Sequence, residues 1–379
     1  MNVLHVSPIP TVLGGVEKGG VESHVSELSQ NLLFKGVNSY FFDNSLPLSN
    51  RTRTNIGNNC FKYSTWFSFI CFLFVGARYF SRLIEKEMPL KRKLRVIADC
   101  GSLSYFTRKN KISLVHVHGI HNIIATACEV IEIPFVITDH GIGHKQVFDV
   151  DKGFLHRNIC SAFKVISISD YSKSNVLQLV NDDKIVKINN PITINEVEKV
   201  NLDYEYAIFN GISDTWVRKG LSRIAEEIEH IILEMQDLYL VVVCNAEDYE
   251  KLMESVSNEY IRQKIKHQLP MDRQSMLSYV KGAKFNLAPS LKEGFSIGYL
   301  ESILLGTPVI GFYSNICEMN NMFNVGYNIP VQPEEKLGDK VRLMMQQLTH
   351  RDNFEIVSNP LSWENQINKF CELYLNAIK

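Results

Sequence analysis

Short runs of apolar, β-branched residues alternate with longer helical patterns along almost the whole chain. Six such runs come first, at residues 2–6, 39–42, 114–118, 135–138, 165–169 and 184–188. Five more follow, at residues 206–209, 239–244, 266–269, 285–288 and 308–312. Strands that alternate with helices are typical of βα units around a parallel sheet. The two series therefore predict an α/β protein with two doubly wound parallel-sheet domains.

The length of the chain and a turn signal predict where the two domains divide. A chain of 379 residues is too long for one ordinary core and suits two domains of about 150 to 200 residues. The sixth strand ends at Asn189-Asn190-Pro191, and a polar stretch runs from there to Asp203. We expect a first Rossmann-like domain over residues 1–190 and a second over residues 191–360.

Charge and cysteine usage exclude several classes of partner. The net charge of −1 gives no general field for polyanions, so we expect no nucleic-acid partner. The eight cysteines are scattered without a CxxC or Cys/His cluster, so we expect neither a disulfide framework nor a metal site. Residues 1–6 have the pattern of a strand rather than of a signal peptide, so we expect a cytoplasmic protein.

One segment of the first domain has the composition of a membrane-binding surface. An aromatic, apolar run begins at Trp66 and ends at Ala77, and ten basic residues lie between Arg78 and Lys111 against three acidic ones. The apolar run is shorter than the ~20 residues that a spanning helix needs. Aromatic residues beside basic ones suit the surface of an anionic membrane. The alternative is a core helix with a solvated basic face. We expect a cytoplasmic protein that can be peripheral at the inner face of the plasma membrane.

The second domain contains a loop and helix start that suit a phosphate bound to a group with hydroxyls. The run is Glu293-Gly294-Phe295-Ser296-Ile297-Gly298-Tyr299-Leu300-Glu301, with Gly306-Thr307-Pro308-Val309-Ile310 shortly after it. It predicts a strand, a glycine turn and a helix over about residues 297–305. The first backbone N–H groups of a helix bind anions, and carboxylates accept hydrogen bonds from vicinal diols.

This run resembles the donor-site signature of retaining group 1 glycosyltransferases (family 4). The resemblance implies the GT-B fold, in which two Rossmann-like domains face a cleft, the first for the acceptor and the second for the nucleotide-sugar donor. It also implies that the last helix pattern, within residues 361–379, crosses back to the first domain. Glu293 would face the donor sugar and Glu301 the ribose. The intervening residues would bind sugar and diphosphate: Gly294, Phe295, Ser296 and Ile297. The alternative is that two glutamates eight residues apart are ordinary surface charges.

Further candidate residues follow strands of the first domain. The glycine pairs Gly14-Gly15 and Gly19-Gly20 precede an amphipathic helix, and Gly19 and Gly20 better resemble the family's glycine loop. His140 stands at the end of a strand, where open α/β sheets bind ligands, and the resemblance implies that it contacts the donor sugar. His118 and His121 lie near a similar strand end. A single histidine at such a place is more often structural, and a glycine pair alone can be a simple turn.

The second domain offers a pair of basic residues for the leaving diphosphate. Gly211 closes its first strand, and Arg218 and Lys219 precede Gly220 and the next helix. The resemblance implies an arginine directly after Gly211 and a lysine before the next glycine. Lys219 matches, but Ile212 stands where the arginine is expected, and Arg218 is the residue that could replace it. For Lys219, the alternative is an ordinary surface lysine.

The resemblance implies a metal-independent retaining hexosyltransferase with no cofactor and a nucleotide sugar as substrate. The acceptor would be a saccharide or a lipid-linked hydroxyl, as in bacterial surface polysaccharide or lipopolysaccharide biosynthesis. Glu293, His140 and Lys219 would be the catalytic residues, with no side chain as a covalent nucleophile. Two alternatives remain, namely a catalytically weak scaffold subunit of another transferase, to which Ile212 points, and a sugar-nucleotide epimerase of the same fold.

Overall fold

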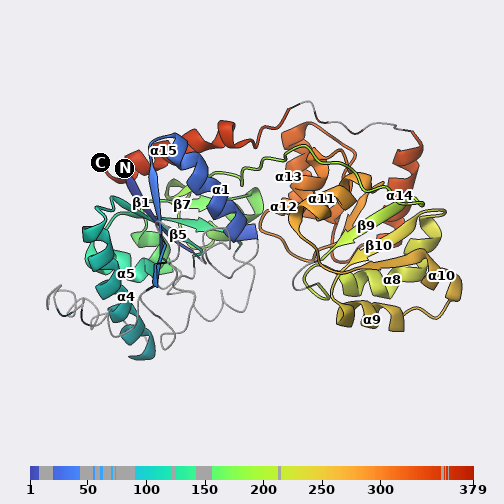
Figure 1. The fold of residues 1–379 in the computed structure, drawn as a ribbon, viewed down its shortest axis with the longest axis horizontal. Coiled ribbons are helices and arrows are strands. Elements are labelled where there is room, and N and C mark those ends of the chain that lie inside the picture. Colours follow the sequence, from blue (N-terminus) through green and yellow to red (C-terminus); the bar gives the residue numbers. More distant parts are fainter. Residues whose placement is uncertain are drawn as a thin grey trace. The chain divides into compact units, whose positions relative to one another are not determined.

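The chain forms two compact units, each with a sheet and covering helices (Figure 1). One unit is Met1–Pro191 together with Trp363–Lys379, and the other is Ile192–Ser362. The computed structural model describes residues 1–7, 20–42, 54–55, 60–62, 70, 73, 90–120, 124–141, 156–211, 215–350, 354, 356 and 358–379. The predicted α/β class with two doubly wound sheets is confirmed.

The sheet of the first unit has eight strands in the order β3-β4-β2-β1-β5-β6-β7-β8. The strands are β1 (Asn2–Val6), β2 (Asn38–Phe42), β3 (Thr54–Asn55), β4 (Cys60–Lys62), β5 (Leu114–His118), β6 (Phe135–Asp139), β7 (Val165–Ser167) and β8 (Ile185–Lys187). Neighbours pair in parallel except for β3 and β4, which are antiparallel. The chain order reverses between β1 and β5, which makes their carboxyl ends the switch point where such sheets bind ligands.

Alternate residues of these strands face two different layers of helices. The helices are α1 (Gly20–Phe34), α4 (Leu90–Lys109), α5 (Ile124–Ile131), α7 (Asp170–Val176) and α15 (Trp363–Ala377), with a 3-10 turn at Asp182–Lys184. Leu4 and Val117 pack into a core with α4 and α5, whereas Val3 and Leu114 pack with α1 and α15. Side chains that alternate across a strand explain this division. Figure 1 shows these two helix layers.

The last helix, α15, is built into the first unit by packing and by hydrogen bonds. Phe370 and Tyr374 are buried against the sheet, and the Trp363 indole N–H donates to Glu27 Oε2 at 2.7 Å. The Tyr374 hydroxyl lies 2.6 Å from His116 Nδ1 on β5. Residues far apart in the sequence therefore share one core.

The sheet of the second unit has six parallel strands in the order β11-β10-β9-β12-β13-β14. They are β9 (Tyr206–Asn210), β10 (Tyr239–Val243), β11 (Ile265–Gln268), β12 (Asn286–Ala288), β13 (Val309–Phe312) and β14 (Ile329–Val331). The helices are α8 (Leu221–Glu234), α9 (Ala246–Glu254), α10 (Glu259–Lys264), α11 (Arg273–Gly282), α12 (Ile297–Leu304), α13 (Tyr313–Phe323) and α14 (Leu337–Thr349). The chain order reverses between β9 and β12, so the switch point lies at their carboxyl ends.

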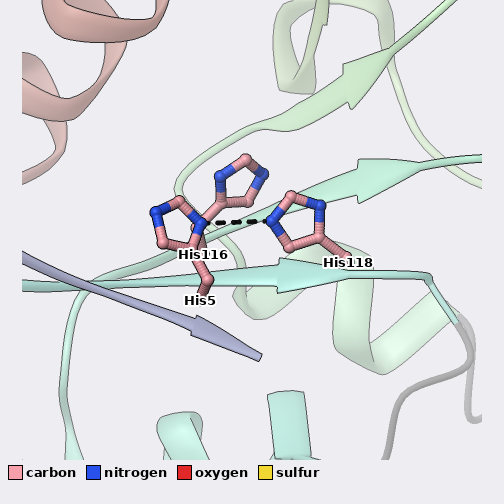
Figure 2. Close-up of side chains that lie close together, drawn as sticks. All are labelled: His5, His116 and His118. Carbon is pink, nitrogen blue, oxygen red and sulfur yellow. Dashed lines mark hydrogen bonds between the residues drawn. The ribbon is translucent and has the colours of Figure 1, made fainter. Parts of the chain in front are cut away.

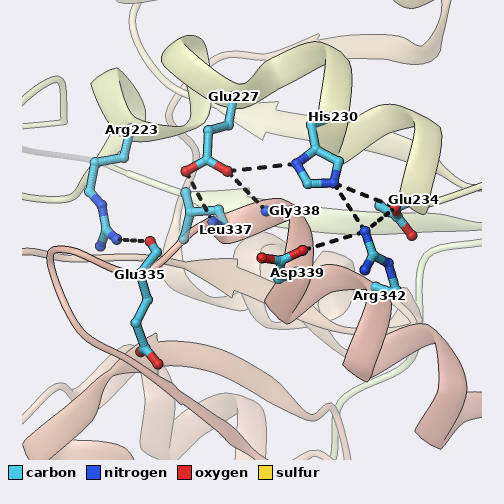
Figure 3. Close-up of polar contacts among 9 residues, drawn as sticks. All are labelled: Arg223, Glu227, His230, Glu234, Glu335, Leu337, Gly338, Asp339 and Arg342. Carbon is cyan, nitrogen blue, oxygen red and sulfur yellow. Dashed lines mark hydrogen bonds and ion pairs between the residues drawn. The ribbon is translucent and has the colours of Figure 1, made fainter.

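A polar network fixes α14 to α8 behind this sheet (Figure 3). The Glu227 carboxylate accepts hydrogen bonds from the backbone N–H groups of Leu337 and Gly338 at 3.0 and 3.2 Å. It thereby satisfies donors at the start of α14 that no helix can satisfy internally. Arg342, one helical turn further on, pairs with Glu234 at 2.8 Å. The network fixes α14 and α8, which both contribute side chains to the core of the second unit.

Candidate active site

The strands β9 and β12 deliver two short segments to the switch point of the second unit. Gly211 follows β9 and donates its N–H to Val243 O at 3.1 Å, and residues 289–296 follow β12. A side chain at position 211 would collide with the Thr215 methyl group, because an added Cβ would lie 2.6 Å from it. The glycine therefore lets the chain turn closely past Thr215 toward α8.

The segment before α8 is locked onto the loop after β12. Gly220 has φ of 86°, and a Cβ there would lie 2.3 Å from Pro289 O, so only glycine fits. The N–H of Leu291 donates to Arg218 O at 3.0 Å. The buried Arg223 guanidinium donates to Pro289 O at 3.3 Å. These contacts fix the backbone of the segment before α8 against the loop after β12, and so set the direction of the side chains of both.

The result is a carboxylate between two basic residues. Lys219 Nζ lies 2.6 Å from Glu293 Oε1, and Arg218 Nη1 lies 3.7 Å from the same oxygen. The Glu293 side chain is only 9% exposed, while those of Lys219 and Arg218 are 24% and 33% exposed. The charge of the buried carboxylate is thus balanced by two cations, and both cations remain partly exposed to solvent. Such a cluster can bind a polar ligand that has both hydroxyls and phosphates.

The turn that follows Glu293 is held by a residue that the sequence did not single out. Asn315 on α13 accepts from the N–H of Ser296 at 3.0 Å and donates to Gly294 O at 3.4 Å. In this structure the Ser296 N–H, which the sequence predicts at the donor site, donates to Asn315 Oδ1. Within the described residues, the N–H groups of Ile297 and Gly298 have no protein acceptor, and both residues are partly exposed. The start of α12 at Ile297 leaves these two donors for an anion.

Tyr299 fixes the direction of α12. Its hydroxyl donates to Ala288 O at 2.6 Å and accepts from the N–H of Phe312 at 3.1 Å. Burial raises the pKa of Tyr299 well above its usual range, so the phenol stays a neutral donor. The first turn of α12 is therefore tied to both β12 and β13, and Phe295 in the turn before it is buried.

Glu301 lies one further turn along α12 and meets another residue that the sequence analysis missed. Arg273, the first residue of α11, donates from Nε to Glu301 Oε1 at 2.7 Å. The Glu301 side chain is 12% exposed and that of Arg273 is 44% exposed. The pair can present a held carboxylate to a diol, which is the chemistry of a ribose. The signal that could have found Arg273 is a basic residue directly after the helix cap Asp272.

The remaining predicted residues belong to the first unit or lie outside the described residues. Gly20 begins α1 and is exposed. His140 follows β6, is partly exposed, and has Nε2 3.0 Å from His118 Nδ1. Burial, then the nearby His24, lowers the pKa of His140 well below its usual range. Outside the described residues lie Gly14, Gly15, Gly19, His121 and Ile212, and most of the segment from Trp66 through Arg78.

Three buried histidines are the one group of described residues whose spacing could suit a metal ion. They are His5, His116 and His118, whose ligand atoms lie within 4.8 Å of one another (Figure 2). The rings of His116 and His118 are stacked at 4.1 Å with 30° between their planes. Stacked rings direct their lone pairs along nearly parallel planes rather than toward one point. The ring nitrogens of His116 also lie 2.6 Å from the Tyr374 and Thr138 hydroxyls. The arrangement suits hydrogen bonds better than metal ligation.

Several solved structures match this architecture over almost the whole chain. A sucrose-phosphate synthase from Thermosynechococcus elongatus matches with a TM-score of 0.66 at 14% identity, over 99% of this chain and 98% of that chain. A glycosyltransferase from Rickettsia africae matches with a TM-score of 0.63 at 15% identity, over 100% and 98%. A lipopolysaccharide outer core galactosyltransferase matches with a TM-score of 0.66 at 13% identity, over 99% of both chains. No curated protein matches the sequence. Two Rossmann-like domains with these counterparts define the GT-B fold.

Both halves of the sequence match a glycosyltransferase family. Residues 18–196 match Glycosyltransferase Family 4, and residues 194–356 match Glycosyl transferases group 1. The chain belongs to the family 4, group 1 glycosyltransferases, and the predicted resemblance is confirmed. It is a glycosyltransferase that uses nucleotide sugars, and enzymes of family 4 act with retention and without a metal.

Proposed function

We propose that this chain transfers a hexose from a nucleotide diphosphate to a hydroxyl of a saccharide or lipid-linked acceptor. The observation that carries the proposal is the cluster of Lys219, Arg218 and Glu293 beside the start of α12. A leaving diphosphate needs cations and oriented N–H groups, and a sugar needs a carboxylate acceptor. The second unit holds all three at one switch point.

Catalysis in this proposal is positioning together with electrostatic stabilisation. The acceptor oxygen bonds to the anomeric carbon as the bond from that carbon to the phosphate oxygen breaks, on the same face. The departing phosphate oxygen takes the proton of the acceptor hydroxyl. Lys219 and Arg218, with the N–H groups at the start of α12, stabilise the charge that develops on the diphosphate. Glu293 orients the hexose, so no covalent nucleophile is needed.

The salt bridge between Lys219 and Glu293 supports a second feature of the mechanism. Because Lys219 Nζ lies 2.6 Å from the carboxylate, the lysine holds Glu293 in one rotamer. A donor with a diphosphate would draw the lysine toward its own negative charge. Glu293 would then accept from a sugar hydroxyl instead. The exchange replaces the contact between Lys219 and Glu293 with contacts from each residue to the ligand. The free-energy cost of breaking the salt bridge is therefore largely offset.

The proposed nucleoside site is the pair of Glu301 and Arg273. Arg273 Nε holds Glu301 Oε1 at 2.7 Å, and the proposed role of this positioned carboxylate is to accept hydrogen bonds from ribose hydroxyls. Arg273 acts here through Glu301 and is a positioning residue. In the first unit, His140 directly follows β6 and Gly20 begins α1. We propose that both contact the substrate.

We also propose that the acceptor is presented at an anionic membrane surface, as in surface polysaccharide or lipopolysaccharide assembly. Supporting it, the first turns of α4 expose Leu90 and Leu94 at 72% and 45% beside the basic Lys91. No helix in the described part of the chain has the length and apolar character to cross a bilayer. Sedimentation with vesicles of anionic lipid tests the proposal. Equal binding to neutral vesicles would contradict it.

The transferase proposal is tested by nucleoside diphosphate release against a panel of UDP- and GDP-sugars. Glu293→Gln removes the charge at the proposed sugar contact, and Glu247→Gln is the matched control, because Glu247 pairs with Lys251 on exposed α9 of the same unit. We expect release with one donor, retained in the control and lost in Glu293→Gln. No release with any donor by the wild type would contradict the proposal and favour the scaffold alternative.

A further inference from the structure

Four side chains on adjacent strands of the first unit form a continuous line of polar contacts. Ser39 Oγ lies 3.2 Å from His5 Nε2, and His5 Nδ1 lies 3.2 Å from His118 Nε2. His118 Nδ1 lies 3.0 Å from His140 Nε2. Figure 2 shows the central link between His5 and His118. We call Ser39, His5, His118 and His140 the histidine line.

The register of the sheet explains why these residues meet. On neighbouring strands, Ser39 is opposite Val3, His5 is opposite His116, and His118 is opposite Thr138. His5, His116 and His118 occupy alternate positions that point to the layer of α1 and α15. Three of the four members are buried, at 8% exposure or less, and His140 closes the line where β6 ends.

Each ring of the line is held neutral by its surroundings. Burial lowers the pKa of His5 to about 3, and burial lowers the pKa of His118 and His140 well below the usual range. The other rings close by, His24 and His116, also have lowered pKa values because they are buried. A neutral imidazole has one N–H donor and one acceptor nitrogen.

Neutral rings joined in this way have only two consistent arrangements. If His5 carries its proton on Nδ1, it donates to His118 Nε2, which forces the His118 proton onto Nδ1 and then the His140 proton onto Nδ1. If His140 carries its proton on Nε2, the same logic places the protons of His118 and His5 on Nε2, and His5 donates to Ser39. The three histidines therefore share one tautomer. The outer nitrogen of His140, Nδ1, is a donor in the first arrangement and an acceptor in the second.

We propose that Ser39, His5 and His118 are positioning residues that set whether His140 Nδ1 donates or accepts a hydrogen bond toward a sugar hydroxyl of the substrate. The proposal rests on the proposed function for the contact of His140 with sugar. It requires no net proton transfer, because each arrangement holds the same number of protons. Through the histidine line, the hydrogen bond at Ser39 on β2 can therefore favour one tautomer of His140 at the end of β6.

His24 and His116 flank the line without belonging to it. His24 on α1 lies edge-on to His140 with ring centroids 5.4 Å apart, and its two ring nitrogens have no partner among the described residues. His116 is stacked on His118, but its nitrogens bond to the Tyr374 and Thr138 hydroxyls. His116 is therefore a matched control, since it shares the strand, the face and the burial of His118.

Tautomers can be read directly in the full-length protein labelled with ¹⁵N-histidine. Long-range ¹H–¹⁵N correlation spectra distinguish a protonated Nδ1 from a protonated Nε2, and single variants assign the signals. We expect His5, His118 and His140 to show the same tautomer, or two populations that are each uniform. Mixed tautomers within one population would overturn the proposal, and so would stoichiometric metal in the purified protein. This readout does not require turnover, so it stands apart from any failure of the transferase proposal.

The positioning role is tested with the far end of the line. Ser39→Ala removes the hydroxyl at His5 Nε2, whereas Ser39→Thr keeps it, and His116→Gln keeps a donor and an acceptor beside the line. We expect Ser39→Ala to change the tautomer balance of His140 and to lower kcat by about twofold to tenfold, the range for one neutral hydrogen bond. The donor KM and the melting temperature should stay close to wild type.

Ser39→Thr should restore the tautomer balance and kcat, and His116→Gln should leave the tautomers of the line uniform. An unchanged His140 tautomer in Ser39→Ala, or an unchanged kcat in a wild type that turns over, would overturn the proposal.

Discussion

The two units use different chemistry at corresponding places of their sheets. At the switch point of the first unit, neutral histidine rings lie in a buried network, with His5 and His116 at 0% exposure. At the switch point of the second unit, Lys219 pairs with Glu293 and Arg273 pairs with Glu301, and both cations are partly exposed. A neutral network satisfies itself by choosing tautomers. A charged pair near solvent can exchange its partner for a ligand.

The difference follows from what each environment permits. Burying a charge without a partner is costly, so buried histidines lose their protons instead. The second unit keeps its charges because each carboxylate has a cation within 2.7 Å and each cation keeps contact with solvent. We therefore expect the neutral histidines of the first unit to orient a substrate through hydrogen bonds. We expect the charged pairs of the second unit to bind the substrate and to stabilise negative charge on it.

The largest expected effect is a loss of stability in the first unit when the pH falls. Histidine in an unfolded chain has a pKa of about 6.5, and in the folded unit His5 and His24 have values of about 3 and 4. Below pH ~6.5 the unfolded chain binds protons that the folded unit excludes, so stability is full above that pH and declines as the pH falls through it. Between about pH 7.5 and 5.5, each such histidine should remove about 1.4 kcal/mol.

Hydrogen exchange with peptide resolution can compare the two units at both pH values, after correction for the intrinsic rate. Peptides from β1, β5 and β6 should lose more protection at the lower pH than peptides from β9 and β10. The cause is the cluster of buried neutral histidines, which has no counterpart among the described residues of the second unit. Equal losses in both units would contradict the contrast.

The second effect is on turnover, through the lysine of the charged cluster. Lys219→Ala removes a cation from the proposed leaving-group site and should lower kcat about 10²- to 10³-fold, as for the loss of one oriented donor. Lys251→Ala removes an exposed lysine that pairs with Glu247 at 2.6 Å in the same unit, and should leave kcat within about twofold. Steady-state release of the nucleoside diphosphate measures both. Similar activity in the two variants would remove Lys219 from the mechanism.

The third effect is on donor affinity. Arg273→Ala removes the Nε–H that donates to Glu301 Oε1 and should raise the donor KM about tenfold, the lower range for a hydrogen bond to a charged group. kcat should change less, because the contact is remote from the bond that breaks. Arg342→Ala breaks an ion pair with Glu234 at 2.8 Å in the same unit and serves as the control. A fall in kcat without a change in KM would assign Arg273 a different role.

The smallest effect concerns the turn before α12. Asn315→Ala leaves the N–H of Ser296 and Gly294 O without their side-chain partner and should lower the free energy of unfolding by about 1 to 3 kcal/mol. Asn321→Ala changes an exposed residue of the same helix and should have little effect. Thermal or denaturant unfolding compares the two. Equal stability of both variants would show that the turn does not depend on Asn315.

Much of the fold was predictable, because its signal is local. The eleven predicted strands are present with ends shifted by at most two residues, α12 begins where the pattern predicts, and α15 lies within the predicted residues 361–379. The strands β3, β4 and β14, of two, three and three residues, were not predicted. The proposed binding segments were singled out by glycines and charges that are adjacent in the sequence.

The partners of those segments could not be predicted, because they come from distant parts of the chain. Arg273 reaches Glu301 from 28 positions away, and Asn315 reaches Ser296 from 19 positions away. His5 meets His118 across 113 positions through the strand order. A single sequence shows each of these residues as ordinary. Only the register of the sheet and the packing of α11 and α13 bring them together.

Hydrogen exchange with and without nucleotide tests whether the donor binds at the loop after β12 and the start of α12. The nucleoside diphosphate released in the donor assay would be added at saturating concentration to the wild type and to Lys219→Ala. We expect exchange in peptides that contain Ile297 and Gly298 to slow strongly in the wild type and weakly in the variant. Protection only elsewhere in the chain, or equal protection in both proteins, would contradict it.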